Sequence, residues 1–188
     1  MAMTKSGHRA SRWLLANALV VGLLAGTPYI IDNLPKAPYP PSQLKPYDSL
    51  AAFRPHYQRE HQNSTSVNLH VIGTSLVVLL ALMHPELILG GIAAVRCGQI
   101  AFMLSRHQNH GLAEFLAMLT AYLGTVRLVR GSLRTAVLTL IVGYAFAWVG
   151  HFFHEMNRPA TFIYPTFSLM CDFLMWAERV TGISINVG

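Results

Sequence analysis

The sequence predicts an all-α membrane protein, a polytopic helical bundle whose chain crosses the bilayer several times. Of the 188 residues, 53% are hydrophobic and only 12% are charged, and the mean hydropathy is +0.39. The apolar residues are gathered into separate runs of about the length that a membrane-spanning helix needs. A chain of this length is expected to build one compact unit.

The first predicted part, residues 1–46, combines an apolar run with a linker. The run over residues 13–31 follows several basic side chains, an order that fits a signal-anchor helix and also a targeting segment that is later removed. Its length favours a retained span. Residues 32–46 contain five prolines and predict an extended linker.

The second predicted part, residues 47–183, is a membrane domain with amphipathic interfacial helices. Residues 49–63 mix apolar and charged side chains and predict a surface helix, interrupted near Pro55. Four core spans are then expected over residues 67–83, 87–104, 112–126 and 135–153. Residues 167–180 predict a second surface helix.

Two histidine-rich stretches stand at the ends of these four core spans. His61 precedes the first span and His70 lies at its start, whereas His151 lies near the end of the fourth span and Glu155 follows it. Four crossings return the chain to its starting side of the membrane. The two stretches can therefore meet in one site, and imidazoles placed beside lipid usually have a function.

The spacing of the second stretch indicates candidate metal ligands. His151 and Glu155 are four residues apart, which places them on one face of a helix, and His154 borders that face. A non-haem ferrous site needs about three nitrogen or carboxylate ligands, with open positions for substrate and oxygen. The candidate ligands are His61, His70, His151, His154 and Glu155.

Other interpretations of these polar residues remain open. Asn63, Asn68 and Glu155 could instead orient the imidazole rings through hydrogen bonds. The order HxxHE is not the HExxH signature, so zinc hydrolysis gains no support. A histidine at a helix end is more often a hydrogen-bonded boundary residue, which we expect of His8, His56, His84 and His107.

Two arginines have competing interpretations. Arg96, inside an apolar run, could pair with Glu114 on the next span, hold a substrate carboxylate, or reach the interface along its aliphatic stem, and a structural role is favoured. Arg158 is better placed to bind an anionic headgroup, although it could simply face a helix C-terminus. The net charge of +6 would allow a nucleic-acid partner. Because the arginines stand at the ends of apolar runs, we expect a lipid bilayer and no nucleic acid.

At these two stretches the chain resembles the 2-hydroxy fatty acid dioxygenase family, long catalogued as a domain of unknown function. The matching positions are residues 57, 60–63, 69–70, 73–76, 148–153, 155–162, 164–165 and 172–173, and the likeness covers about residues 47–183. The resemblance implies an Fe(II)-dependent membrane enzyme that shortens 2-hydroxy long-chain fatty acids, derived from the sphingolipid base phytosphingosine, by one carbon in α-oxidation. Its substrates would be the 2-hydroxy fatty acid and O2.

The resemblance also implies roles for single residues. The family's motif histidines correspond to His61, His70 and His151, and its acidic residue corresponds to Glu155. We therefore expect the three imidazoles to bind iron(II), with Glu155 as a ligand or an orienting carboxylate. The residues expected to support the rings or bind the substrate carboxylate are Asn63, Asn157 and Arg158.

The last expectations concern the membrane in which the protein lies and the alternatives to the enzymatic function. The family resemblance implies the endoplasmic reticulum in a eukaryote, and the inner membrane would be the counterpart in a bacterium. One alternative is a non-catalytic lipid-binding or scaffold protein that keeps the motif for helix packing. A less favoured alternative is a transporter, with Arg96 and Glu114 as charges along its pathway.

Overall fold

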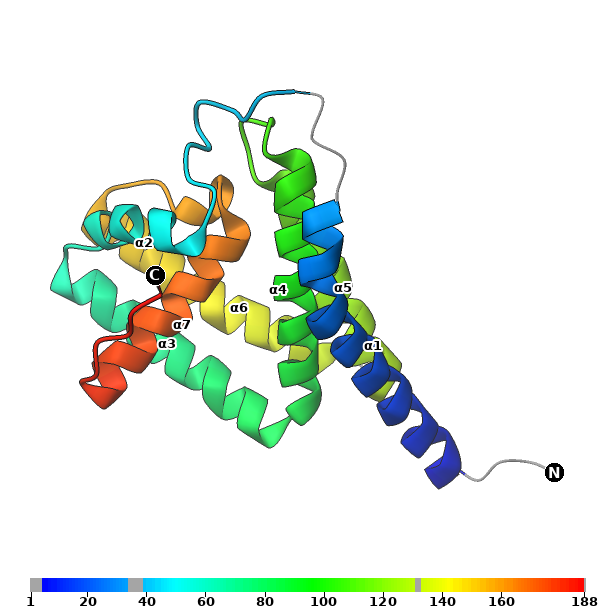
Figure 1. Ribbon diagram of the computed structural model, residues 1–188. Coiled ribbons are helices and arrows are strands. Elements are labelled where there is room, and N and C mark those ends of the chain that lie inside the picture. Colours follow the sequence, from blue (N-terminus) through cyan, green and yellow to red (C-terminus); the bar gives the residue numbers. More distant parts are fainter. Residues whose placement is uncertain (1–4, 34–38, 131–132, 188) are drawn as a thin grey trace.

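The structure is a computed structural model that describes residues 5–33, 39–130 and 133–187, and every regular element in these residues is helical (Figure 1). Residues 34–38 of the expected linker lie outside the described residues. The elements are α1 (Lys5–Asn33), α2 (Leu50–Arg59), α3 (Ser64–Met83), α4 (Pro85–Ser105), α5 (Leu112–Arg130), α6 (Arg134–Val149), the π-helix η1 (Gly150–Glu155), the 3-10 helix η2 (Ala160–Phe162) and α7 (Pro165–Thr181). The predicted all-α fold is confirmed.

Within the described residues, five helices are long and apolar enough to cross a membrane. They cover Trp13–Ile30, Ser64–Met83, Glu86–Ser105, Leu112–Val129 and Arg134–Glu155. These ranges agree with the four core spans and the possible N-terminal span expected from the sequence. Large hydrophobic side chains on these helices face outward, such as Leu79 and Leu82 on α3 and Ile141 on α6. Such exposure suits lipid contact. The chain is therefore an integral membrane protein.

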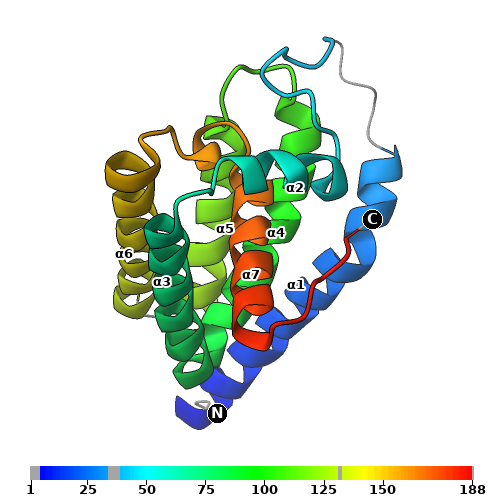
Figure 2. The ribbon, with the colours of Figure 1, turned by 90° about the vertical axis from the view of Figure 1, so that its left-hand side faces the viewer.

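The spanning helices form two groups, with α7 between them. On one side α4 packs against α5, and α1 lies against both; on the other side α3 packs against α6 (Figures 1 and 2). Helix α7 contacts α3, α4 and α5, and α2 lies across the end of the bundle at which α3 begins. The expected second surface helix is thus packed between the two groups.

Close packing brings the start of α3 against the end of α6. A Cβ added at Gly73 would lie 2.8 Å from the Cβ of Phe146, and one added at Gly150 would lie 2.8 Å from the Ser66 hydroxyl. Only glycine leaves room for such approaches. The two histidine-bearing helices are therefore held side by side at the end that carries their imidazoles.

Helix α2 differs from the expected helix over residues 49–63 at two points. Ser49 caps it, its hydroxyl accepting from the Ala52 amide at 3.3 Å, and the helix continues through Pro55. Pro55 has no amide hydrogen, so the helix gives up one backbone hydrogen bond at this position and still continues to Arg59. The helix ends at Arg59, which leaves His61 in the connection to α3.

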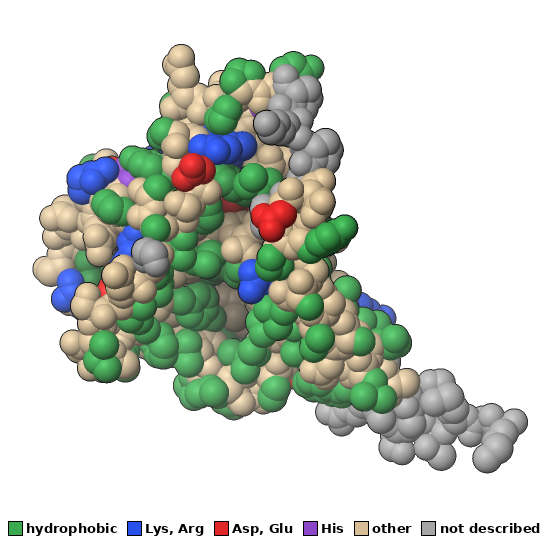
Figure 3. All heavy atoms as spheres, in the orientation of Figure 1, with side chains coloured by type: hydrophobic (Ala, Val, Ile, Leu, Met, Phe, Trp, Pro, Cys, Tyr) green, Lys and Arg blue, Asp and Glu red, His purple; other side chains and the backbone are tan. Residues whose placement is uncertain are grey.

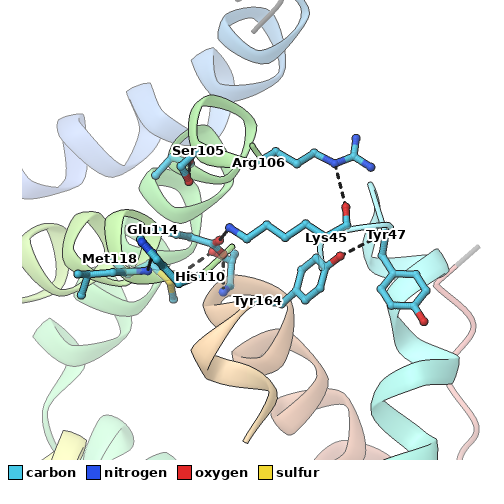
Figure 4. Close-up of polar contacts among 11 residues, drawn as sticks. Lys45, Tyr47, Ser105, Arg106, His110, Glu114, Met118 and Tyr164 are labelled. Carbon is cyan, nitrogen blue, oxygen red and sulfur yellow. Dashed lines mark hydrogen bonds and ion pairs between the residues drawn. The ribbon is translucent and has the colours of Figure 1, made fainter. Parts of the chain in front are cut away.

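The described end of the linker is anchored to the turn between α4 and α5 (Figure 4). The Ser42 amide donates to the Arg106 carbonyl at 3.0 Å, and Arg106 donates to the Lys45 carbonyl at 3.4 Å. The Lys45 side chain is fully buried and its ammonium lies 3.9 Å from the Glu114 carboxylate. Burial lowers the pKa of Lys45, and Glu114 opposes part of that shift. Glu114 therefore pairs with the linker and not with Arg96.

Candidate metal centre

Three imidazoles from distant parts of the chain meet at one end of the bundle. The ring centroids of His61 and His70 are 4.8 Å apart, those of His61 and His151 are 4.7 Å apart, and those of His70 and His151 are 5.1 Å apart. All three side chains are buried. One nitrogen from each ring lies within 4.8 Å of the other two, the arrangement of a group that could hold a metal ion.

Each imidazole has its Nδ1 atom engaged by a hydrogen-bond acceptor. His61 Nδ1 lies 2.7 Å from the Tyr57 carbonyl, His70 Nδ1 lies 2.9 Å from the Asp172 carboxylate, and His151 Nδ1 lies 2.7 Å from the Asn157 side-chain oxygen. A carbonyl or carboxylate can only accept, and an amide oxygen likewise. The three acceptors therefore place the ring protons on Nδ1 and leave the Nε2 lone pairs free.

The Nε2 atoms fit a bound cation. Those of His61 and His70 are buried and have no hydrogen-bond partner among the described residues. Burying a polar atom without a hydrogen-bond partner costs free energy, and a cation bound between these Nε2 atoms would remove that cost. Burial and the neighbouring His70 lower the pKa of His61 to about 4, which keeps its ring neutral and able to bind a metal at neutral pH. Neutral imidazole is a ligand for iron, zinc or copper.

Local backbone structure turns each ring inward. The His61 ring follows α2 and stacks on the Tyr57 ring with centroids 4.0 Å apart. His70 lies in the second turn of α3, which Asn63 caps by accepting from the amides of Thr65 and Ser66. His151 lies in the π-helix η1, a wider turn that is common at functional sites.

The π-helix ends in a reversal that completes the support of His151. Met156 adopts a left-handed conformation with φ of 54°. The chain then folds back, so that the Asn157 amide donates to the His151 carbonyl at 3.2 Å. The Asn157 side chain donates in turn to the Glu60 carbonyl at 2.9 Å and to the Glu60 carboxylate at 3.0 Å. Asn157 thereby joins His151 to the segment that carries His61.

Asp172 and Tyr57 are site residues to which the sequence pattern alone gives no role. Asp172 on α7 accepts from His70 and from the Tyr57 hydroxyl. Burial would raise the pKa of Asp172, but these hydrogen bonds outweigh it and lower the pKa, so the carboxylate stays charged. Burial and Asp172 together raise the pKa of Tyr57. The available signal was that Asp172 is the one acidic residue in the apolar stretch 167–176.

The other expected site residues lie around the three imidazoles and not among them. The Glu155 carboxylate accepts from the Asn63 amide at 2.9 Å, and the Asn63 side chain donates to the His154 carbonyl at 3.2 Å. The side chains of His154 and Arg158 are exposed. The group of possible metal ligands found in the described residues contains neither His154 nor Glu155. Because η1 is a π-helix, the four-residue spacing no longer aligns Glu155 with His151.

A large cavity adjoins the imidazoles. Its volume is about 620 Å³, within the range of roughly 300–1,000 Å³ that is common for small-molecule sites. His70, His151 and Asp172 line one part of it, and apolar side chains of the spanning helices line most of the rest. Figure 3 shows the molecule hollowed between α7 and α4, with hydrophobic side chains around the hollow. An apolar chain is the ligand that such a wall favours.

Comparison with known proteins identifies the family. No curated protein matches the chain, and no solved structure matches it. The family model described as 2-hydroxy-palmitic acid dioxygenase Mpo1-like matches residues 47–183. This range contains the three imidazoles, their Nδ1 partners and most of the cavity wall. The chain therefore belongs to the 2-hydroxy-palmitic acid dioxygenase Mpo1-like family.

Proposed function

We propose that the protein is an iron(II)-dependent dioxygenase that shortens 2-hydroxy long-chain fatty acids by one carbon. The observation that carries the proposal is the convergence of His61, His70 and His151 beside an apolar cavity. The family description supports the reaction class and the fatty acid substrate. Three neutral nitrogen ligands also leave coordination positions open, as oxygen-activating iron sites require.

The proposed substrate suits both parts of the site. Its carboxylate and 2-hydroxyl group are adjacent and can be held at the polar end, beside His70 and His151. Its acyl tail would lie among the apolar side chains of the cavity and enter from the bilayer without passing through water. Bound iron(II) would supply the activation of O2.

The protein's own residues would orient the site. The Tyr57 carbonyl, Asp172 and Asn157 hold the three Nδ1 protons outward, which fixes each ring and keeps each Nε2 atom available. Asn63 and Glu155 would not contact the imidazoles, but would support them by joining the start of α3 to η1 through hydrogen bonds. The exposed Arg158 would bind an anionic headgroup or substrate at the membrane boundary.

The proposed reaction balances without an external reductant. One 2-hydroxy acid and one O2 give a carboxylic acid one carbon shorter, one CO2 and one water. We place the reaction in the endoplasmic reticulum membrane if the source is eukaryotic and in the inner membrane if it is bacterial. The family resemblance supports the first location.

Anaerobic purification followed by metal analysis tests the proposal. We expect about one iron per chain, and oxygen consumption with 2-hydroxyhexadecanoic acid that a ferrous chelator abolishes. Pentadecanoic acid should accumulate in step with oxygen uptake. Hexadecanoic acid, which lacks the 2-hydroxyl group, is the control and should consume no oxygen.

Two results would contradict the proposal. Iron-loaded protein that binds the 2-hydroxy acid but consumes no oxygen would favour the non-catalytic lipid-binding alternative. Protein that binds zinc alone, and gains no activity on anaerobic replacement of zinc by iron(II), would exclude ferrous chemistry at this site.

A further inference from the structure

One charged side chain in the cavity wall has no role in the metal centre. Arg96 lies near the middle of α4 and lines the cavity. Its guanidinium donates to the Gln99 side-chain oxygen at 3.0 Å. No carboxylate of the described residues lies within 4 Å of it, because Glu114 is paired with Lys45. Among the described lining residues Arg96 is the one arginine or lysine.

A cation in such a wall is costly unless it meets an anion. The surroundings of Arg96 on α4 are Ile92 and Val95, and Leu119 lines the cavity from α5. In an apolar wall inside the membrane an arginine usually pairs with another group or marks a binding site. The interaction with Gln99 uses part of the guanidinium fork and leaves other N–H donors for a ligand.

The packing of α4 on α7 sets the depth of Arg96 relative to the metal centre. Gly98 packs directly on the Thr166 side chain at the start of α7, and the two helices run in opposite directions (Figure 1). Asp172 is then about 9 Å along α7 from Thr166, and Arg96 is about 3 Å along α4 from Gly98 in the same direction. The two residues therefore differ in depth along the helices by only about 6 Å.

Helices α4 and α7 each present one face to the cavity. Val95, Arg96 and Gln99 line it from α4, and Ser168 and Asp172 line it from α7. Because Asp172 contacts His70 at 2.9 Å, the Arg96 side of the cavity faces the side that carries the imidazoles. Arg96 and two of the imidazoles, those of His70 and His151, thus line the same cavity.

We propose that Arg96, held in orientation by Gln99, binds the carboxylate of a long-chain 2-hydroxy acid in this cavity. A guanidinium binds a carboxylate through two parallel hydrogen bonds, so the carboxylate is fixed while the hydroxyl-bearing carbon faces the imidazoles. The acid is thereby distinguished from the neutral lipids of the bilayer. This assignment rests on the substrate class of the proposed function, and it requires neither iron nor turnover.

Binding to the full-length protein in nanodiscs tests the assignment. The ligands are 2-hydroxyhexadecanoic acid and hexadecane-1,2-diol, which differ in the carboxylate, and the protein is used both as purified and after chelation. Wild type should bind the acid roughly 10- to 100-fold more tightly than the diol, the value of one charge-assisted interaction. Arg96→Met should abolish this preference and leave diol binding unchanged, whereas Arg96→Lys should keep part of it.

Matched variants separate recognition from folding. Ile92→Ala, on the same face of α4, should weaken acid and diol equally, and Gln99→Leu should reduce the acid preference while keeping the charge. The assignment is overturned if Arg96→Met keeps the acid preference, if it weakens both ligands equally, or if wild type does not distinguish them. Chelated wild type that prefers the acid through Arg96, with iron-loaded protein that consumes no oxygen, leaves the assignment standing and removes only the proposed reaction.

Discussion

A comparison of two buried polar clusters among the described residues shows two different responses to the cost of burying polar groups. Lys45 and Glu114 lie 3.9 Å apart with opposite charges, at the junction of the linker and α5 (Figure 4). The imidazole triad, which comprises His61, His70 and His151, contains three bases that offer nothing positive to one another. The pair supplies its own counter-charge, whereas the triad is a group of ligand atoms that could hold a cation.

The presence or absence of a counter-charge distinguishes the Lys45–Glu114 pair, a structural cluster, from the imidazole triad, a candidate ligand site. In the charged pair, Glu114 also accepts from the Thr166 amide at 2.8 Å, so removal of either charge strands the other in the interior. In the triad, the outward Nδ1 atoms have acceptors, whereas the inward Nε2 atoms of His61 and His70 have no hydrogen-bond partner. Lys45 Nζ and Glu114 Oε2 also lack a hydrogen-bond partner, but these two atoms face an opposite charge. Mutations should therefore affect mainly stability at the first cluster and mainly metal binding at the second.

The largest expected effect is the loss of metal from His70→Ala. Two imidazoles cannot replace three, so the affinity for iron should fall by more than the roughly 10–100-fold expected from loss of an orienting partner. The thermal unfolding temperature of the metal-free variant should fall modestly, because the buried Asp172 carboxylate loses its hydrogen bond from His70. Metal analysis and thermal unfolding in detergent measure the two quantities. His154→Ala is the control, and iron loss from it equal to that from His70→Ala would place His154 among the ligands.

Lys45→Met should show the opposite pattern. The uncompensated Glu114 carboxylate should lower the free energy of unfolding by about 3–5 kcal/mol, with iron content unchanged in the folded fraction. The double variant Lys45→Met with Glu114→Met should recover most of this loss, because no charge remains buried. Denaturant unfolding of the single and double variants forms the test, and a double variant no more stable than the single one would show that the pair is not a self-neutralising unit.

Asp172→Asn should weaken iron binding without removing it. The amide keeps the shape of the carboxylate but loses the charge that holds the His70 proton and orients its ring, which should cost about 10–100-fold in metal affinity. Competition with a graded series of ferrous chelators measures this change. Asn157→Ala should act similarly through His151, and an affinity unchanged in both variants would contradict the orienting role of the Nδ1 partners.

Glu155→Gln should have the smallest effect. Its carboxylate accepts from the Asn63 amide, and a neutral acceptor in its place should lower stability by about 1 kcal/mol. Iron stoichiometry should stay at the wild-type value. A variant that loses its iron would instead make Glu155 a ligand, and metal analysis alone decides between these outcomes.

The sequence predicts the large-scale arrangement well, because hydrophobic runs report spanning helices directly. An even number of core spans already places His70 and His151 on one side of the membrane, and in the structure their rings adjoin. The Nδ1 partners are harder to predict. Asp172 is 102 residues from His70 and reaches it only because α7 packs against α3.

Local pattern rules also fail where the backbone departs from the regular helix. The four-residue spacing assumes an α-helix at Glu155, but residues 150–155 form a π-helix. Likewise, Arg96 and Glu114 stand on neighbouring spans, yet Glu114 meets Lys45 from the linker. A proline-rich segment gives no sequence signal that it will bury a lysine, so that contact could not be expected.

Because residues 150–155 form a π-helix, the position of Asn157 relative to His151 depends more on the number of residues in this segment than on their identities. Phe152, Phe153 and His154 are exposed, so their identities should matter little to the interior. Deleting any one of them would allow the turn to tighten into an ordinary α-helix, rotating everything beyond it and carrying Asn157 away from His151. A π-helix of this kind can arise from a single inserted codon, and point substitutions in this stretch would not reveal how strictly its length is constrained.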